Sequence, residues 1–330
     1  MRIGVTGASG LLGGNLALAA CARGDTVVAT RRAGSRVEHL ADAPITWVDA
    51  ALDDPFALER AFEDCEVVFH VAAQVSVRRR ATPEMVAANV DGTRHVLAAA
   101  RRAGVRRVLH TSTVAALGLT EDGRPSTENA RFNFAEHGME DGYVRTKRAA
   151  DEVVTQFVAD GADIVTVHPT YMLGPYDAKP SSGKILLALA RGGIPGVTAG
   201  INNFVDVRDV ARGMLAAAES GRAGERYILG GEELSYADAF RRMAAVIGVK
   251  PPTLRIPRWA AAIGGLAGDA RERLFAGEPE LNSVTVGWGY CGTFRFSSAK
   301  AQNELGYTSG PLENAVADAM AWFRARGMCR

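Results

Sequence analysis

The sequence has almost no excess charge of either sign and no long hydrophobic run. Lysine and arginine number 38 and aspartate and glutamate 37, so the formal net charge of the 330 residues is +1. Nucleic acids and anionic membranes are bound through concentrated positive charge, and this balance argues against both partners. A strand-like run begins at Arg2 without a charged leader, so we expect no signal peptide.

The most apolar stretch late in the chain, residues 259–268, is too short to cross a bilayer, so no integral membrane segment is expected. We expect this stretch to be packed inside the protein. The alternative is a lid or surface helix beside a lipophilic substrate.

Cysteine is scarce, and histidine shows no metal-binding pattern. The cysteines are scattered without paired metal spacing, which is typical of reduced thiols in a cytoplasmic protein. They are Cys21, Cys65, Cys291 and Cys329. None of the six histidines has zinc-ligand spacing, so no metal site is predicted. His70 and His168 end predicted strands, where we expect them to pack or to support other groups.

Short β-branched runs alternate with helical stretches along the first 170 residues. This alternation predicts an α/β fold with a doubly wound parallel sheet of the Rossmann type. The expected strands cover residues 2–6, 26–30, 45–48, 66–72, 105–110 and 163–168, and the main helices cover 11–23, 83–102 and 143–160. Thr82 is the expected N-cap of the second of these helices, because a proline follows it.

A glycine-rich turn joins the first strand to the first helix. It reads Thr6-Gly7-Ala8-Ser9-Gly10-Leu11-Leu12-Gly13. The first glycine permits a tight turn, the second lets a pyrophosphate approach the backbone, and the third allows close packing of helix on strand. Free N–H groups at the helix start face the phosphate charge. The turn therefore predicts a dinucleotide site, with a plain glycine turn as the alternative.

Two arginines, Arg31 and Arg32, follow the second strand, where an acidic residue would accept hydrogen bonds from an adenosine ribose. Guanidinium groups there favour the 2′-phosphate of NADP. NADP is the preferred cofactor and NAD stays open. The competing interpretation is a solvated basic loop.

Tyr143 and Lys147 are four residues apart, so both side chains share one helical face. An ammonium beside a phenol favours the phenolate, and we expect Lys147 to lower the pKa of Tyr143 and make it a general acid or base. The lysine is also placed to hold the ribose hydroxyls of the cofactor. A pair on an exposed helix face is the alternative.

A run of hydroxyl residues, Thr111-Ser112-Thr113, ends the strand at 105–110. Ligands of parallel sheets bind at this carboxyl edge, so a hydroxyl here is placed to hydrogen-bond a substrate oxygen. The alternative is a turn that closes the strand.

Beyond residue 170 the pattern is less regular and richer in glycine and proline. We expect residues 1–170 to form the NAD(P)-binding Rossmann domain and residues 171–330 to form mainly a smaller, substrate-binding α/β domain. Segments near 204–207 and 227–229 are expected to complete the first sheet.

These motifs together resemble the extended short-chain dehydrogenases/reductases, within the NAD-dependent epimerase/dehydratase superfamily, along nearly the whole chain. Further matching segments are His70-Val71-Ala72-Ala73, Asn89-Val90-Asp91-Gly92-Thr93, His168-Pro169-Thr170 with Leu173-Gly174-Pro175, and Phe204-Val205-Asp206-Val207-Arg208-Asp209-Val210. Among bacterial members the likeness is to dihydroflavonol-4-reductase-like proteins and to proteins labelled hopanoid-associated epimerases.

The resemblance implies a role for each matching residue. The pyrophosphate would be held by Gly7, Ser9, Gly10, Leu11, Leu12 and Gly13, and the rest of the cofactor would meet the Leu52 backbone, Ala72, Ala73 and Pro169. Thr113 would be the catalytic hydroxyl with Ser112 in support, Tyr143 the acid or base, and Lys147 its partner, whereas Asn89 would be structural. The helices at 83–102 and 143–160 would form a homodimer.

Two positions depart from the family pattern. Ala51 stands where an aspartate often meets the adenine, which leaves only the Leu52 backbone for that contact. Asn202 stands where sugar-nucleotide enzymes often carry a diphosphate-binding arginine.

Three reactions, all hydride transfers at a carbonyl or carbinol carbon, compete within the family. A 4,6-dehydratase would need an Asp-Glu pair where Val114 and Ala115 follow Thr113. A sugar-nucleotide epimerase needs a diphosphate anchor, to which Lys184 and Arg191 would be candidates. A reductase of a bulky ketone or aldehyde, like dihydroflavonol-4-reductase or the 3β-hydroxysteroid dehydrogenases, is favoured.

A non-catalytic dinucleotide sensor is a remote alternative, because such members usually lose the tyrosine or lysine. Residues 121–140 are expected either to fold over the substrate or to form an ordinary surface loop. The substrate itself is not predicted.

Overall fold

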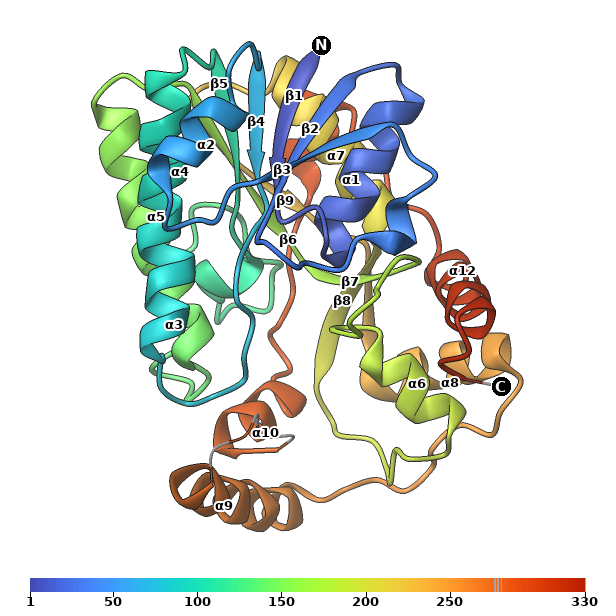
Figure 1. Ribbon diagram of the computed structural model, residues 1–330. Helices are drawn as coiled ribbons and strands as arrows, with labels where there is room; N and C mark the ends of the chain where they lie inside the picture. The colour runs from blue at the N-terminus through green and yellow to red at the C-terminus, as the bar shows by residue number, and fades with distance from the viewer. Residues whose placement is uncertain (276, 278, 280, 330) are drawn as a thin grey trace.

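A computed structural model describes residues 1–275, 277, 279 and 281–329. Its centre is a seven-stranded parallel sheet in the order β3-β2-β1-β4-β5-β6-β9 (Figure 1). The strands are β1 (Arg2–Thr6), β2 (Thr26–Arg31), β3 (Ile45–Asp49), β4 (Val67–His70), β5 (Arg107–Thr111), β6 (Ile164–Pro169) and β9 (Arg226–Leu229). The predicted Rossmann sheet is confirmed, since its first six strands lie within two residues of the expected positions.

Helices cover both faces of this sheet. The helices α1 (Leu11–Ala22) and α7 (Val207–Ser220) share a core with Val27 and Val67, whereas α2 (Pro55–Ala61), α4 (Gly92–Arg102) and α5 (Gly142–Ala159) share another with Val28 and Val68. Neighbouring residues of one strand point to opposite faces. Both faces are therefore buried, which is why the strands are continuously apolar.

The helix expected at 83–102 is interrupted by a wider turn. It consists of α3 (Pro83–Val86), a π-helical turn (Ala87–Asp91) and α4. Thr82 is the N-cap, as expected, and its hydroxyl accepts a 3.3 Å hydrogen bond from the Met85 amide.

A second, three-stranded sheet has the order β10-β8-β7 and lies below the first in Figure 1. Its strands are β7 (Tyr171–Leu173), β8 (Ile201–Asp206) and β10 (Glu232–Ser235), and it packs with α6 (Lys184–Ala190), α8 (Tyr236–Ile247) and α12 (Leu312–Ala325). The helix α11 (Ala299–Leu305) packs instead against α7 and β9.

The expectation that residues 204–207 complete the first sheet is wrong, whereas the expectation for 227–229 is right. Phe204 pairs with Tyr171 and Glu232 in the second sheet, and Tyr227 pairs with Val167 in the first. A buried apolar run predicts a strand but does not specify its partner, since that depends on the connections between strands.

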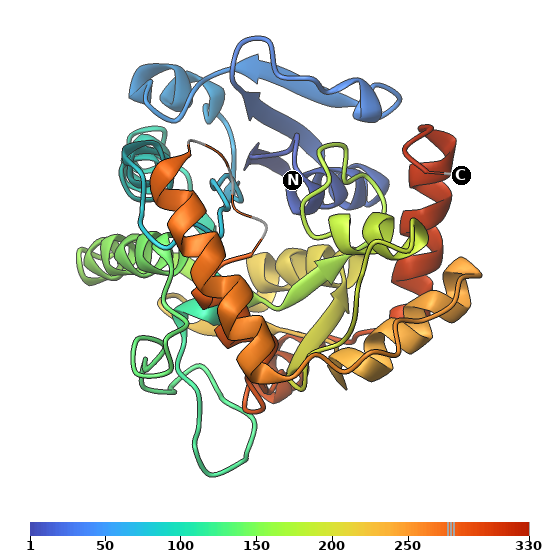
Figure 2. The same ribbon diagram turned by 90° about the horizontal axis from the view of Figure 1, so that it is seen from below.

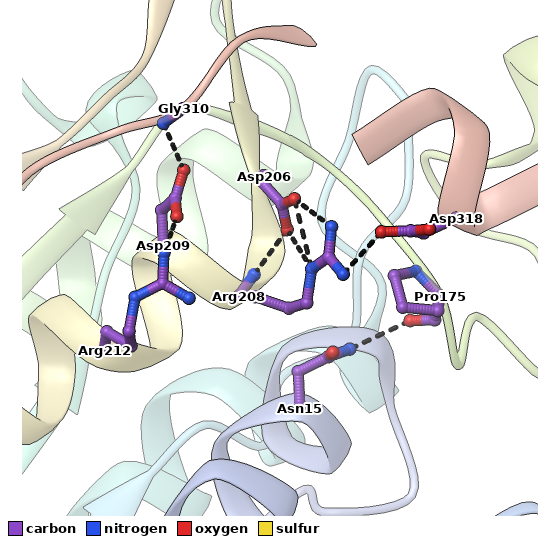
Figure 3. A network of polar contacts seen from close by, with 8 residues as sticks. All are labelled: Asn15, Pro175, Asp206, Arg208, Asp209, Arg212, Gly310 and Asp318. Carbon is purple, nitrogen blue, oxygen red and sulfur yellow. Dashed lines mark hydrogen bonds and ion pairs between the residues drawn. The ribbon is translucent and has the colours of Figure 1, made fainter. Parts of the chain in front are cut away.

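A polar network joins the two sheets where β8 passes into α7 (Figure 3). The Asp206 carboxylate accepts the Arg208 amide and pairs with the Arg208 guanidinium, which also reaches Asp318 on α12 at 2.6 Å. Asn15 on α1 donates to the Pro175 carbonyl at 2.9 Å. The segment at 204–210 therefore links the start of α7 to α12, and Asn15 ties α1 to the loop after β7.

Two helices, α9 (Arg258–Leu274) and α10 (Ser283–Gly289), lie at the outer end of the second part of the chain. Figure 1 shows α9 at the bottom of the molecule, and Figure 2 shows it crossing the lower face. Our expectation that residues 259–268 are packed is wrong, because Trp259, Ile263 and Leu266 are exposed. Among the described helices, none has the length and apolar character of a membrane span.

Candidate active site

The glycine turn leaves no room for side chains at two of its three glycines. Gly7 has a φ of +75°, and a Cβ there would lie 2.6 Å from the Ala72 amide nitrogen. A Cβ on Gly13 would lie 2.3 Å from the Gly7 carbonyl oxygen. At Gly10 the nearest atom to such a Cβ is 3.4 Å away, so the cradle is open on this side. The turn fits the approach of a pyrophosphate.

The start of α1 is free to receive an anion. Gly10 is its N-cap and supplies no side-chain hydrogen bond, and the first turn contains no acidic residue. The N-terminal amides and the helix dipole there favour negative charge. Ser9 is half-buried beside these amides, whereas Leu11 and Leu12 point into the core.

Of the two arginines at the end of β2, Arg31 is ion-paired, whereas Arg32 has no ion pair with the residues that the structure describes. Arg31 forms a 2.8 Å ion pair with Asp49, at the end of the neighbouring strand β3. Arg32 is exposed and has no ion pair within the described residues. Asp49 was not singled out from the sequence, although parallel pairing of two consecutive strands would bring their ends together.

The loop after β4 borders the glycine turn, and the loop after β3 lies against α4. The Leu52 carbonyl accepts a 2.8 Å hydrogen bond from His95 Nδ1, so this loop is held against α4. Ala51 is half-buried and contributes no polar side chain.

Thr6 and His70 set the position of the Ala72–Ala73 segment. The Thr6 hydroxyl accepts the amides of Val71 and Ala72, both at 3.2 Å, and lies 2.8 Å from His70 Nδ1. His70 Nε2 lies 3.0 Å from the Thr93 hydroxyl. Burial lowers the pKa of His70 well below its ordinary value, so the ring is neutral and serves this loop as a support.

Asn89 links the cofactor loop to the catalytic helix. Its side chain accepts the Gln74 amide at 2.7 Å and donates to the Gln74 carbonyl at 3.0 Å and to the Thr146 hydroxyl at 2.9 Å. These contacts agree with the structural role that the resemblance implies for Asn89.

Tyr143 and Thr113 meet at the carboxyl edge of the sheet. Thr113 lies two residues after the end of β5, and its side chain lowers the pKa of the Tyr143 phenol. Gly7, Arg32, Ala72 and Pro169 lie at the ends of β1, β2, β4 and β6, and therefore at the same edge. The structure thus brings the predicted cofactor and catalytic residues to one side of the sheet.

The expectation that Lys147 lowers the pKa of Tyr143 is wrong in this structure. Burial raises the pKa of Tyr143, the charges of Asp141 and Asp151 raise it further, and Thr113 opposes them. Lys147 Nζ donates instead to the Thr111 carbonyl, at 2.6 Å. Burial lowers the pKa of Lys147 to about 8, against the attraction of Asp151.

Asp151 is an ionised carboxylate beside Ser112, the residue before Thr113. Its oxygens accept the Ser112 hydroxyl at 2.7 Å and His110 Nε2 at 3.2 Å. Burial by itself would raise its pKa, but the hydrogen bond from His110 and the electrostatic effects of the neighbouring His168, His110 and Lys147 lower it to about 2. Sequence reasoning missed this residue, although it lies four positions after Lys147 on the same helical face.

His168 supports Thr113 from β6. Its Nδ1 donates to the Thr113 carbonyl at 2.9 Å, and burial lowers its pKa to about 4, so it is neutral near pH 7. Pro169, the next residue, ends β6 beside Leu229.

Asp141 caps the catalytic helix two residues before Tyr143. Its carboxylate accepts the Val144 amide at 2.8 Å, and burial raises its pKa to about 7. The Gly142 amide donates to the Arg78 carbonyl at 2.9 Å, which ties the start of α5 to the loop after β4. Asp141 was also missed, since an N-cap aspartate carries no sequence signal of a raised pKa.

The position of the diphosphate-binding arginine is filled by a structural amide. Asn202 donates to the Tyr236 hydroxyl at 3.2 Å inside the second sheet. Of the two candidate replacements, Arg191 donates to the Met328 carbonyl near the C-terminus, and Lys184 is exposed at the start of α6.

Residues 121–140 form a partly buried loop. Phe134 and Met139 are buried with Phe294 and Phe296, and Glu128 accepts the Ile228 amide at 2.9 Å. Two runs within this stretch, residues 121–125 and 135–138, are exposed.

Comparison with known proteins agrees with this geometry. The model of the NAD dependent epimerase/dehydratase family matches residues 3–230. Sterol demethylase protein B of Methylococcus capsulatus is 36% identical over 98% of both chains. A putative dihydroflavonol 4-reductase of Synechocystis sp. is 33% identical over 98% of this chain and 94% of its own.

Similarity extends to solved structures. A nucleoside-diphosphate-sugar epimerase from Pseudomonas aeruginosa superposes with a TM-score of 0.82 at 29% identity, over 100% of this chain and 99% of the other. The family match covers most of the chain, and the two relatives align along nearly their whole length. The chain therefore belongs to the NAD dependent epimerase/dehydratase family, the extended short-chain dehydrogenases/reductases, and is an NAD(P)-dependent oxidoreductase.

Proposed function

We propose that this enzyme is an NADP(H)-dependent reductase of a ketone or aldehyde on a bulky small molecule, and oxidises the corresponding alcohol in reverse. The observation that carries the proposal is the placement of Thr113, after β5, at the same carboxyl edge of the parallel sheet as the glycine turn, with Tyr143 at the start of α5. The bound nicotinamide supplies the hydride. Residues 1–170 would bind mainly the cofactor and residues 171–330 mainly the substrate.

The proton chemistry belongs to this chain. The hydroxyls of Thr113 and Tyr143 would hydrogen-bond the carbonyl oxygen as negative charge develops on it. Because burial raises the pKa of Tyr143, the phenol stays protonated near pH 7 and is ready to donate a proton in the reductive direction. Lys147 would hold the ribose hydroxyls, and Ala72, Ala73, Leu52 and Pro169 would line the cofactor.

Arg32 supports the preference for NADP. It is exposed at the end of β2, whereas Arg31 is engaged by Asp49. A free guanidinium favours a 2′-phosphate. Of the two arginines that favour NADP in the sequence, Arg32 is therefore the one available to the 2′-phosphate.

Epimerisation of a sugar nucleotide is the second candidate, and the similarity to the Pseudomonas nucleoside-diphosphate-sugar epimerase favours it. The buried amide of Asn202 speaks against it, since this position supplies no cation to a diphosphate. A dehydratase is disfavoured because Val114 and Ala115 form a buried turn after Thr113. The retained Tyr143 and Lys147 disfavour a non-catalytic sensor.

The test is to follow oxidation of NADPH and NADH by the purified protein against aldehydes, flavanonols, ketosteroids and sugar nucleotides. We expect NADPH oxidation with a bulky ketone or aldehyde. Epimerisation of a sugar nucleotide without net cofactor consumption would overturn the assignment, and a wide preference for NADH would overturn the argument from Arg32.

We also propose a cytoplasmic location and a homodimer. All four cysteines are described and none forms a disulfide, as in a reducing compartment. The helices α3, α4 and α5 lie side by side at one edge of the molecule, where the partner would pack (Figure 1). Sedimentation equilibrium of the purified chain would give the mass of one or of two subunits.

A further inference from the structure

One outer helix carries an exposed apolar face. Of the ten large hydrophobic side chains that are exposed in the described part of the chain, seven lie between Leu254 and Leu281. On α9 these are Trp259, Ile263, Leu266 and Leu274, which are between 62% and 76% exposed and are called the apolar face below. Single exposed hydrophobic residues are ordinary, but a contiguous group of this kind marks an interaction site.

The spacing of these residues places them together on the helix. At 3.6 residues per turn they fall within about 80° of arc. The opposite side is made of glycines that pack closely on the following segment: a Cβ on Gly268 would lie 1.9 Å from the Leu281 carbonyl oxygen, and one on Gly265 would lie 3.0 Å from the Val286 side chain. The glycine side is therefore the packed one, and the apolar face points away from the protein.

Inward-facing acids fix α9 in this orientation. Asp269 forms a 3.2 Å ion pair with Arg79 and accepts the Ser283 amide at 2.9 Å. Glu272 accepts the Arg79 amide at 3.0 Å and faces Asn282 Nδ2 at 3.5 Å. Turning the apolar face inward as a lid would break all of these contacts, so the helix is built to present it outward.

Among the described residues of α9 and its N-terminal flank, the exposed charged side chains are arginines. Arg255, Arg258, Arg271 and Arg273 are exposed, and none of them forms an ion pair with an acid that the structure describes. The helix's own acids, Asp269 and Glu272, are turned inward. The net charge of +1 argues against an anionic membrane only if the charges are spread evenly over the surface. The described arginines instead gather beside the apolar face.

We propose that the outer side of α9 docks on the surface of an anionic phospholipid bilayer. The apolar face would enter the boundary between headgroups and acyl chains, and the arginines would meet lipid phosphates. Trp259 suits this boundary because its ring has an apolar body and a polar N–H. A second copy of the chain is a poorer occupant, since a two-fold contact would place arginines opposite arginines.

The contacts of α9 relate this surface to the active site. Asn282, the N-cap of α10, donates to the Val77 carbonyl at 2.5 Å, and Trp288 on α10 donates to the Met139 carbonyl at 2.9 Å. Both partners belong to segments that flank the start of α5, where Tyr143 lies. Docking would therefore hold the active site close to the lipid surface, whatever carbonyl compound the enzyme reduces.

Vesicle flotation of the purified full-length protein tests the proposal. We expect the wild type to float with vesicles of phosphatidylcholine mixed with phosphatidylglycerol, weakly with phosphatidylcholine alone, and less in high salt, which screens the arginines. Ile263→Gln with Leu266→Gln should weaken binding at least about tenfold. Arg258→Gln and Arg271→Gln should each weaken it about fivefold, the equivalent of 1 kcal/mol per cation.

Matched controls are available elsewhere on the surface. Phe56→Gln removes an equally exposed hydrophobic side chain, and Arg124→Gln removes an exposed arginine from a loop, so both should leave flotation unchanged. The proposal fails if the wild type floats with neither vesicle or if the Ile263/Leu266 variant floats as well as the wild type. It also fails if that variant changes a dimer to a monomer in sedimentation, because the face would then contact a second copy.

Discussion

The Ser112 hydroxyl donates a 2.7 Å hydrogen bond to the Asp151 carboxylate, so the residue beside Thr113 points into the protein. The Asp151 carboxylate also accepts a 3.2 Å hydrogen bond from His110 Nε2, and its charge raises the pKa of Lys147. Through these contacts one buried carboxylate holds the strand end that carries Thr113 and influences the protonation of Lys147. Asp151 is therefore a positioning residue, since it acts through these partners.

Asp151→Asn should change the pH profile as well as the rate. Without the carboxylate, the pKa of Lys147 falls further below its present value of about 8, so activity that needs a protonated lysine is lost at a lower pH. We expect kcat/KM to fall about tenfold, the size of one charge-assisted hydrogen bond. Glu152→Gln, at an exposed position on the same helix, is the control. An unshifted profile would leave Asp151 with a structural role only.

Tyr143→Phe should abolish turnover and spare the cofactor site. Loss of a general acid reduces kcat by about 10²–10⁴-fold. Binding of NADPH, followed by its fluorescence, should stay close to that of the wild type, because the ring still fills its place. Turnover that survived the change would contradict the assignment of the proton donor.

Asp141→Asn should make the phenol easier to ionise. The charge on Asp141 raises the pKa of Tyr143, and Asp141 itself titrates near pH 7. Asparagine is also a good N-cap, so the helix and the melting temperature should be retained. We expect the basic limb of the kcat/KM profile to move to lower pH and a step near pH 7 to disappear. A profile identical to that of the wild type would show that this charge does not reach the phenol.

Gly10→Ala and Gly13→Ala should separate binding from stability. A Cβ fits beside Gly10 at 3.4 Å from the nearest atom, so this variant should fold normally but lose about tenfold or more in cofactor affinity through a displaced phosphate. A Cβ on Gly13 would overlap the Gly7 carbonyl at 2.3 Å, and this variant should lose about 1–3 kcal/mol of stability. Thermal denaturation and NADPH titration measure the two effects. If both variants lost the same stability and the same affinity for NADPH, the assignment of Gly10 to cofactor binding and of Gly13 to packing would be contradicted.

Arg32→Ala should weaken NADPH and leave NADH nearly unchanged. A charge-assisted contact to the 2′-phosphate corresponds to about a tenfold difference in kcat/KM. Arg31→Ala should have a smaller effect, because that guanidinium is already engaged by Asp49. If Arg31→Ala and Arg32→Ala reduce the preference for NADPH over NADH by the same factor, the ion pair between Arg31 and Asp49 opens when the cofactor binds.

The sequence by itself determined the succession of the parallel strands and the glycine turn between β1 and α1, and it predicted the catalytic set. These are local properties: a strand, a glycine turn and a four-residue helical spacing are each complete within a few consecutive residues. Only the tertiary structure decided that residues 204–206 join the second sheet, because strand pairing depends on distant segments. It also decided that Arg31 is paired, that Lys147 faces a carbonyl and that Asp151 lies under Ser112.

The stretch at 259–268 shows the same division. Its apolar character is plain in the sequence, and by itself that character favours burial. The structure turns the glycines and acids of α9 inward, so the large apolar side chains are left outside. Which face of a helix is buried depends on the segments that pack against it, and those segments are brought there only by the folded chain.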